Sequence, residues 1–589
     1  MRRTQPQTHT SVLHPPAAGA LDEAILKSLD AAREYLFSIQ QPDGHWVGEL
    51  EGDTILESEY ALLRYFMGCL DEDRLRKLAN YLRQKQRPEG GWASFPGGGV
   101  EVSGSVKAYL VLKLAGLSAD HPEMVRAREA ILAHGGVTAC NTFTKIYLAI
   151  FGQYDWDGTP VVPPELALLP SWFYLNLNEI SSWSRAIVVP LAIIVAHRPH
   201  CPLPVSIDEL FIGGRHGRHL RLQPAGNPFT WRNFFLGIDR CLHFFEDRKI
   251  LPWRKKALKA CEQWMVARFR KSGGLGAIFP PIVNALMAMR LLGYPDDHPE
   301  VLGQWREIEA FEIEEGDTLR LQPCVSPVWD TALSTMALSA AGTAPDDPAM
   351  VRAGEWLLER RIREKGDWAV KRPDAPVAAW FFEYANEFYP DVDDTAAVLM
   401  ALESVRLPND AEKRAICSQA VEWVFAMQGQ DGGWASFDVD NNRMIFAQIP
   451  FADHNAMLDP STSDITARTL EMLARYGYDR SEPRVQRAIA FIQQDQEHDG
   501  AWFGRWGVNY IYGTWQVLKG LSVIGEDMDQ PYIQKAAQWL RDHQNEDGGW
   551  GESCQTYDDP SLRGKGPSTA SQTAWALMGL MSAGDVSSE

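Results

Sequence analysis

Three carboxylates stand within four residues at Asp391, Asp393 and Asp394, and an apolar run at residues 397–402 follows them closely. The run is apolar on every face, which predicts a helix buried on all sides with the acids at its N-terminus. An aspartate there caps free backbone N–H groups and complements the helix dipole. Capping explains one acid, whereas a third carboxylate against an apolar helix is costly to bury unless its charge is neutralised.

Acids this close together cannot all ionise freely, so at least one of them is expected to keep its proton near neutral pH. Clustered acids with shifted pKa values are also typical of catalytic sites. The cluster therefore has two interpretations, helix capping and a proton donor facing an apolar space. Both stay open on these residues alone.

The composition limits the kinds of molecule that the protein is expected to bind. The chain has 589 residues and a formal net charge of -20, from 57 basic and 77 acidic residues, which argues against nucleic acid as the main partner. Its eight cysteines are scattered without a C-x-x-C pair, which indicates a reducing compartment and no cysteine-based metal site. The longest apolar run, residues 186–196, is too short to span a bilayer and contains Pro190.

One pattern recurs along the chain: an aromatic–aliphatic pair, then a glutamine, then a Gly-X-Trp turn. Copies end at Trp46, Trp92, Trp434, Trp502 and Trp550, and a weaker copy joins Trp356 and Leu357 to Trp368. Each copy predicts a helix that stops at a glycine with positive φ and is covered by the tryptophan. A second apolar helix follows each turn, and stacked hairpins of this kind form a solenoid or close into a toroid.

The sequence therefore predicts an all-α fold with two α/α toroid (barrel) domains built from helical hairpins with Gln/Gly/Trp turns. After a disordered lead at residues 1–20, residues 21–45 and 315–589 are expected to form the toroid that carries the acids. Residues 46–314 are expected to form the second toroid. A closed ring would gather the N-termini of the inner helices and place residues 391–394 beside a central cavity.

The D-x-D-D motif at residues 391–394, combined with the Q-x₃-G-x-W repeats, resembles the squalene–hopene cyclases, which are class II terpene cyclases. The resemblance covers nearly the whole chain from about residue 21. Further matching stretches lie at residues 181–183, 327–330, 380–383 and 502–510. The resemblance implies proton-initiated polycyclisation of squalene to hopene and hopanol, without a metal or cofactor.

The resemblance also assigns roles to residues. Asp393 matches the family's acid, and Arg468 is expected to stabilise the carboxylate that remains after proton transfer. Asp391, Asp394 and Asp464 complete the expected catalytic group. Aromatic faces stabilise carbocations without attacking them. The expected substrate-binding residues are Trp183, Ile278, Trp329, Phe382, Phe437, Phe451 and Trp506.

A predicted amphipathic helix at residues 231–245 is relevant to whether the protein binds a membrane. Its apolar face comprises Trp231, Phe234, Phe235, Ile238, Leu242 and Phe245. This helix is either buried in the protein or dips into a bilayer beside the substrate entrance. Squalene is insoluble in water, so the expected partners are squalene from the bilayer and a membrane surface. We expect a peripheral, monotopic protein on the cytoplasmic face of the bacterial membrane, and a homodimer is a further expectation.

Other functions stay open. One is a class II cyclase acting on a diterpene diphosphate or another polyprene, and another is a zinc prenyltransferase β-type toroid. In relatives a further Gln/Gly/Trp repeat follows the helix at residues 568–581, whereas this sequence ends at Glu589. A catalytically impaired, C-terminally truncated cyclase acting as an α-toroid scaffold is therefore a third alternative.

Overall fold

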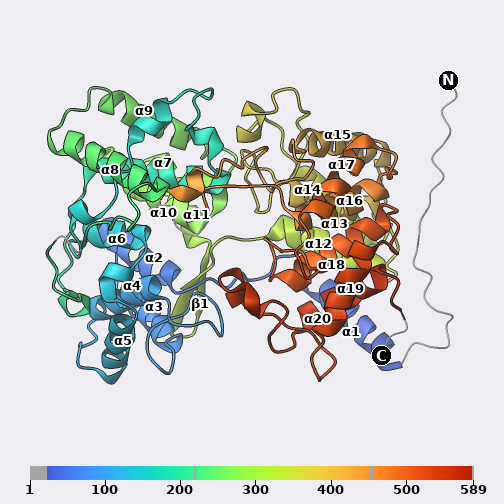
Figure 1. Ribbon diagram of the computed structural model, residues 1–589, viewed down its shortest axis with the longest axis horizontal. Coiled ribbons are helices and arrows are strands. Elements are labelled where there is room, and N and C mark those ends of the chain that lie inside the picture. Colours follow the sequence, from blue (N-terminus) through green and yellow to red (C-terminus); the bar gives the residue numbers. More distant parts are fainter. Residues whose placement is uncertain (1–22, 218–219, 450–455, 587–589) are drawn as a thin grey trace. The chain divides into compact units, whose positions relative to one another are not determined.

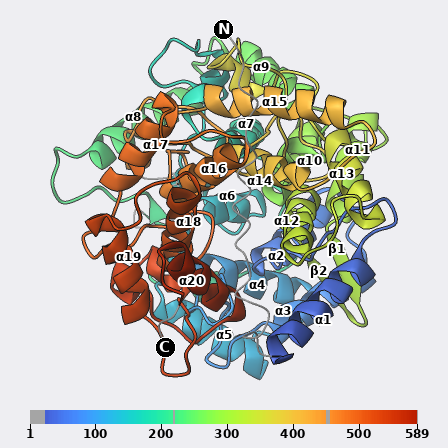
Figure 2. The ribbon, with the colours of Figure 1, turned by 90° about the vertical axis from the view of Figure 1, so that its right-hand side faces the viewer.

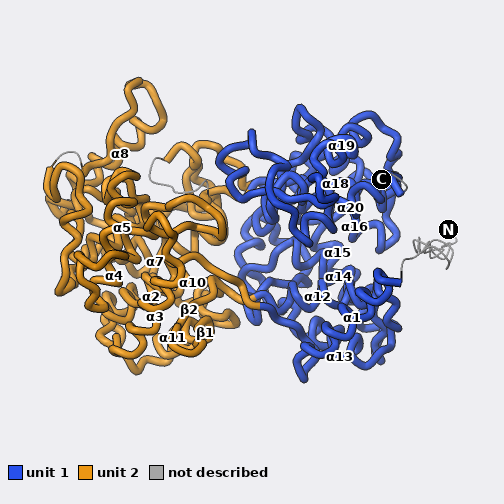
Figure 3. The backbone as a smooth tube through the Cα atoms, turned by 90° about the horizontal axis from the view of Figure 1, so that it is seen from below, with its two compact units in different colours: residues 1–48, 326–440, 460–589 blue, residues 49–325, 441–459 orange. Residues whose placement is uncertain are grey.

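A computed structural model of the chain describes residues 23–217, 220–449 and 456–586 (Figure 1). The chain divides into two compact units (Figure 3). Unit 1 comprises residues 1–48, 326–440 and 460–589, and unit 2 comprises residues 49–325 and 441–459. The predicted lead at residues 1–20 lies outside the described residues, as does Phe451.

Unit 1 alternates inner and outer helices. The inner helices are α12 (Pro327–Ala340), α14 (Val392–Glu403), α16 (Ser463–Arg475), α18 (Tyr510–Val523) and α20 (Ala570–Ser582). The outer helices are α1 (Glu23–Ile39), α13 (Pro348–Glu359), α15 (Asp410–Ala426), α17 (Pro483–Gln494) and α19 (Pro531–Asp542). Each inner helix packs against the next one along the chain, and Figure 2 shows them inside the outer helices.

The Gln/Gly/Trp turn joins the outer helices α15, α17 and α19 to the inner helices that follow them. At Trp434 the indole N–H donates to the Val424 carbonyl at 2.7 Å, and the backbone N–H donates to the Thr466 hydroxyl at 3.0 Å. Gly432 has φ 97°, which favours glycine. The same indole bond, to a carbonyl ten residues earlier, is made by Trp46, Trp92, Trp502 and Trp550. The repeat therefore fixes where each inner helix begins.

One copy differs from its prediction. The indole that donates to the Leu357 carbonyl, at 2.6 Å, belongs to Trp380 rather than to Trp368. Trp368 instead packs edge-on against Trp423, with ring centroids 5.9 Å apart. The longer connection between residues 357 and 380 lets a later tryptophan take the repeat position. Trp380 is consequently the residue that positions the helix after the acid cluster.

Unit 2 repeats the arrangement around a second core. Its helices are α2 (Ile55–Phe66), α3 (Glu72–Gln84), α4 (Val102–Leu114), α5 (Pro122–Ala133), α6 (Thr142–Ile150), α7 (Ser182–His197), α8 (Trp231–Asp247), α9 (Arg254–Ala267), α10 (Phe279–Leu291) and α11 (Pro299–Glu309). Helix α10 packs against both α7 and α2, so the last inner helix of the unit contacts the first one. The predicted all-α fold with α/α toroid units is thus confirmed.

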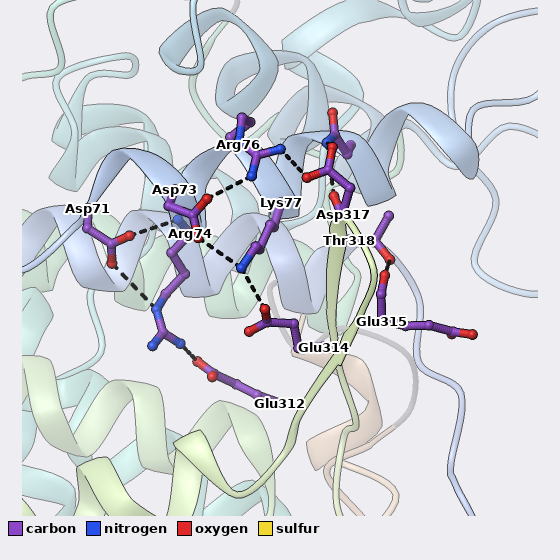
Figure 4. A network of polar contacts seen from close by, with 11 residues as sticks. Asp71, Asp73, Arg74, Arg76, Lys77, Glu312, Glu314, Glu315, Asp317 and Thr318 are labelled. Atoms are coloured by element: carbon purple, nitrogen blue, oxygen red, sulfur yellow. Dashed lines mark hydrogen bonds and ion pairs between the residues drawn. The ribbon is translucent and has the colours of Figure 1, made fainter.

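A short hairpin interrupts this helical pattern in unit 2. Strands β1 (Glu312–Glu315) and β2 (Thr318–Leu321) are antiparallel and lie against α3, where charged side chains of both elements form a network (Figure 4). Lys77 of α3, for example, lies 2.5 Å from Glu314 and 2.8 Å from Asp73. These contacts place the hairpin in unit 2, whereas the predicted boundary at residue 315 would have cut through it.

The segment 441–459 also departs from the predicted division, which assigned it to the domain with the acids. Phe446 and Leu458 of this segment form a small buried cluster with Ile180. The backbone N–H of Ser181 donates to the Met457 carbonyl at 2.9 Å. Both contacts join the segment to unit 2.

Candidate active site

The acid cluster opens helix α14. Asp391 is the N-cap, and its side chain accepts a hydrogen bond from the Asp394 backbone N–H at 2.7 Å. Its own backbone N–H donates to the Trp380 carbonyl at 3.0 Å. The Thr395 hydroxyl accepts from the Trp380 N–H at 3.0 Å. The predicted capping role is therefore filled by Asp391, and the repeat tryptophan sets the position of the whole helix entry.

Asp393 forms a buried ion pair with Arg468 of the neighbouring inner helix α16. The Asp393 Oδ1 and Arg468 Nε atoms are 2.6 Å apart, without the alignment of a hydrogen bond. The two residues are 9% and 6% exposed. Arg468 also donates to the Tyr512 hydroxyl at 2.8 Å, and its guanidinium lies 4.9 Å from the Trp329 ring centroid. The predicted partnership of acid and arginine thus has the expected geometry.

The acids of the cluster have raised pKa values. Burial raises the pKa of Asp393, the Arg468 charge opposes that rise, and Asp464 adds to it. Burial likewise raises the pKa of Asp391 to about 7 and that of Asp394 well above its usual range. Since Arg468 is the only cation paired with an acid of this cluster among the described residues, the cluster holds protons at neutral pH.

Asp464 has a structural task in this arrangement. Its Oδ1 accepts from the Ile465 N–H at 2.9 Å, and its Oδ2 accepts from the Trp506 N–H at 3.0 Å. It therefore fixes the start of α16 and the loop that carries Trp506. Its negative charge still acts on Asp393.

Two residues of the site were not assigned from the sequence. Tyr512 opens α18, and Glu383 is buried and accepts a hydrogen bond from the Asn386 side chain at 3.1 Å. Burial raises the pKa of Glu383 to about 8, and the Asp391 charge adds to this. The one sequence signal for Glu383 was its place directly after Phe382, and no signal marked Tyr512.

The predicted substrate-binding side chains of unit 1 are all partly accessible. Trp329, Phe382 and Phe437 are half-buried, and Trp506 is 43% exposed. The Phe437 and Trp506 rings meet edge to face, with centroids 6.4 Å apart. All four side chains belong to the unit that holds the acids.

The other predicted binding residues lie in unit 2 or outside the described residues. Trp183 is half-buried on α7, and its indole donates to the Ala456 carbonyl at 2.7 Å. Ile278 is half-buried at the N-cap of α10. Phe451 is not among the described residues. Within the described part of the chain, no three His, Cys, Asp or Glu residues are placed to hold a metal ion.

Comparison with known proteins shows the family of the chain. The squalene-hopene cyclase N-terminal domain family matches residues 29–317, and the squalene-hopene cyclase C-terminal domain family matches residues 325–589. A squalene–hopene cyclase of Zymomonas mobilis is 42% identical over 99% of this chain and 89% of its own length. One from Alicyclobacillus acidocaldarius is also 42% identical, over 96% of this chain and 89% of its own length.

A relative with another name is nearly as similar. The dammaradiene synthase of Dryopteris crassirhizoma is 39% identical over 98% of this chain and 86% of its own length. Products therefore vary among relatives at this level of identity. The chain belongs to the squalene–hopene cyclase family and is a class II terpene cyclase of the triterpene type.

Proposed function

We propose that this protein cyclises squalene to hopene and hopanol, with Asp393 as the proton donor. The observation that carries the proposal is the buried Asp393–Arg468 ion pair, which lies in the same unit as the partly accessible side chains of Trp329, Phe382, Phe437 and Trp506. A neutral acid beside a fixed cation suits proton transfer to a weak base such as an alkene.

In the first step the O–H bond of Asp393 breaks and a C–H bond forms at a terminal double bond, leaving a tertiary carbocation. Arg468 stabilises the new carboxylate, and its bonds to Tyr512 and Trp329 hold the guanidinium in place. Ring closures follow as further double bonds attack the cation. The last cation either loses a proton to water, which gives hopene, or adds a water molecule that then loses a proton to solvent, which gives hopanol.

Aromatic rings stabilise the intermediate cations in this proposal. Trp329, Phe382, Phe437 and Trp506 of unit 1 have accessible faces for this role, and the resemblance adds Trp183, Ile278 and Phe451. We expect Phe382→Ala to release partially cyclised products, because an intermediate cation would lose its stabilising ring. An unaltered product profile would remove Phe382 from this role.

The direct test is incubation of the purified protein with squalene in detergent and D₂O. The proposal expects pentacyclic products that carry one deuterium from the initiating step. A product with another skeleton, such as a dammaradiene, would keep the chemistry and change the product. Turnover that chelators abolish would contradict the acid mechanism.

We also propose that the protein attaches to a membrane through α8. None of the helices in the described part of the chain has both the length and the hydropathy to cross a bilayer. Helix α8 buries Phe235 and Leu236, while Trp231 (52%), Phe234 (53%) and Phe245 (42%) are exposed. The fully buried interpretation of this face is therefore wrong for most of its residues.

A polar anchor explains why the apolar face points outward. Asp239 of α8 is buried and accepts from the Val161 N–H at 2.8 Å, and His243 lies 3.0 Å from the Thr159 carbonyl. The exposed aromatic side chains suit the interface of a bilayer, where squalene dissolves. The cytoplasmic face of the bacterial membrane as the site of attachment, and a homodimer, remain predictions of the resemblance.

The attachment is tested with vesicle co-sedimentation of Phe229→Ser/Phe234→Asp. Phe229 is 94% exposed and Phe234 is 53% exposed, so the variant is expected to fold. Phe235 is unsuitable because it is 6% exposed and belongs to the core contact of the helix. The variant should lose vesicle binding, and undiminished binding would refute the role of α8.

A further inference from the structure

A cavity lies on the side of α8 next to its exposed aromatic face. Its volume is about 560 Å³, within the range of small-molecule sites. Three arginines, Arg221, Arg240 and Arg248, contribute to its lining together with Asp157 and Asp247. All of these residues belong to unit 2. The catalytic proposal uses none of them.

The arginines of this cavity are available to a ligand. Arg240 and Arg248 are exposed and form no ion pair with any residue that the structure describes. Arg248 rests on the Phe244 ring, 3.7 Å from its centroid, which holds the guanidinium beside the cavity. Arg221 lies 3.3 Å from Asp157, but both side chains are more than 60% exposed, so that pair is weak.

The lining carries both signs of charge. Guanidinium groups bind phosphate oxygens through paired N–H donors. Carboxylates such as those of Asp157 and Asp247 would repel a free anion but accept hydrogen bonds from a primary ammonium group. Asp247 already lies 3.5 Å from Arg198, but its side chain is 56% exposed, so that pair is weak. A ligand that joins a phosphate to an ammonium group a few bonds away can contact both sets of side chains.

The neighbouring surface indicates what the rest of the ligand is. Phe244 lines the cavity and is 48% exposed, and Ile238 and Phe245 on the same helix are also exposed. An acyl chain leaving the cavity would therefore run over apolar side chains. Figure 3 shows α8 at the periphery of unit 2.

We propose that this cavity binds the headgroup of a phosphatidylethanolamine-type phospholipid, with the phosphate on Arg240 and Arg248 and the ammonium group on Asp157 and Asp247. The proposal rests on the proposed membrane attachment and deepens it by naming the lipid. It gives α8 two modes of contact, an apolar one with the acyl layer and a polar one with a particular headgroup.

The test compares vesicle binding of the wild type with that of Arg240→Gln/Arg248→Gln. The vesicles are phosphatidylcholine alone, or with added phosphatidylethanolamine or phosphatidylglycerol. We expect tighter binding with phosphatidylethanolamine, and a loss of that preference by at least about ten-fold in the double variant, as two charge-assisted hydrogen bonds would give. Turnover of squalene in detergent should not change.

Lys255→Gln/Lys256→Gln is the matched control, because it removes the same charge from exposed positions on the next helix. An equal loss in this control, a preference for phosphatidylglycerol, or no preference in the wild type would overturn the proposal. Failure of the wild type to bind any vesicle would refute the membrane attachment itself. In that case, binding of soluble glycerophosphoethanolamine to the protein, measured by saturation-transfer NMR, still tests the headgroup site.

In that measurement, binding that disappears in Arg240→Gln/Arg248→Gln supports the site, and the absence of binding to the wild type overturns it. Inorganic pyrophosphate serves as the competing probe. Tighter binding of pyrophosphate than of glycerophosphoethanolamine would also overturn the proposal and would indicate a diphosphate ligand.

Discussion

The two units contain the same helix entry with different chemistry. In unit 1 residues 391–395 read Asp-Val-Asp-Asp-Thr, and in unit 2 residues 101–105 read Glu-Val-Ser-Gly-Ser. The first residue of each caps its helix: Asp391 accepts from the Asp394 N–H, and Glu101 accepts from the Ser103 and Gly104 N–H groups. The fifth residue of each uses its hydroxyl to accept from the backbone N–H of a repeat tryptophan.

The difference lies at the third and fourth positions. Ser103 and Gly104 occupy them in unit 2, where the entry is formed without further acids. Asp393 and Asp394 are therefore not required to build this local structure, although both are buried. Comparison of the two units separates capping, which Asp391 performs, from the acid chemistry that we propose for Asp393.

The acids around the buried ion pairs of the two units differ in how strongly burial acts on them. In unit 2, Lys107 lies 2.5 Å from Glu59, and burial raises the pKa of nearby Asp53 to about 6. In unit 1, Arg468 pairs with Asp393, while burial raises the pKa of Asp391 to about 7 and that of Asp394 well above its usual range. Asp391 and Asp394 therefore keep protons to higher pH than Asp53 does.

The largest effect on activity is expected from replacing Asp393 and Asp394 by the residues that stand at the same positions of the helix entry in unit 2. Asp393→Ser/Asp394→Gly should lower squalene turnover by about 10³-fold or more, because general acid catalysis contributes on the order of 10²–10⁴-fold. The melting temperature should fall, because Arg468 is left buried without its partner, but the Asp391 cap and the Thr395 bond remain and should keep the protein folded. Product formation within a few-fold of the wild type would show that neither Asp393 nor Asp394 is the acid.

Arg468→Gln should have the next largest effect. Without the guanidinium the pKa of Asp393 rises further and its carboxylate loses its stabilising charge, so squalene turnover should fall by about 100-fold. Oxidosqualene, whose epoxide accepts a proton more readily, should be turned over with a smaller loss. Arg475→Gln on the same helix is the control, because Arg475 is exposed and pairs with Glu471 at 2.9 Å. Equal losses on both substrates would argue for a structural role of Arg468.

A smaller effect is expected on the way the free energy of unfolding depends on pH. Burial raises the pKa of Glu383 in unit 1 and of Glu57 in unit 2 to about 8 each. The folded state therefore binds more protons than the unfolded state between about pH 4.5 and 8, and stability falls as pH rises through that window. Glu383→Gln and Glu57→Gln should each make this fall shallower, by up to about 1.4 kcal/mol per pH unit.

The pH dependence of activity should distinguish these two variants. The charge of Glu383 raises the pKa values of the acids beside it, so Glu383→Gln should lower them and move the decline in turnover to lower pH. Glu57→Gln should leave the pH–activity profile unchanged, since its Oε1 atom serves to accept from the Leu321 N–H. Thermal melts and turnover measured across pH 5–9 check both expectations, and identical activity profiles for all three proteins would exclude Glu383 from the site.

Much of the fold could be predicted because the repeat is local in sequence. Gln428, Gly432 and Trp434 show a turn without knowledge of the rest of the chain. The position of Trp380 could not be predicted in this way, because its partner Leu357 lies 23 residues away. An apolar stripe predicts that α8 is amphipathic but not which side faces the protein, and the buried anchor at Asp239 decides that.

The site was predictable where motif and charge coincide, as at Asp393 and Arg468. Tyr512 and Glu383 could not be assigned, since their roles depend on neighbours from other helices or on burial. Unit boundaries depend on the same long-range contacts, which is why residues 441–459 were placed with the wrong partners.

Single-turnover reaction of squalene with Asp393→Asn tests the central claim most directly. The amide has nearly the shape of the protonated acid but cannot release a proton to an alkene, so the account predicts a folded protein that forms no cyclised product. Cyclised product at about a tenth of the wild-type rate or more, above the smallest loss expected for a missing general acid, would contradict it.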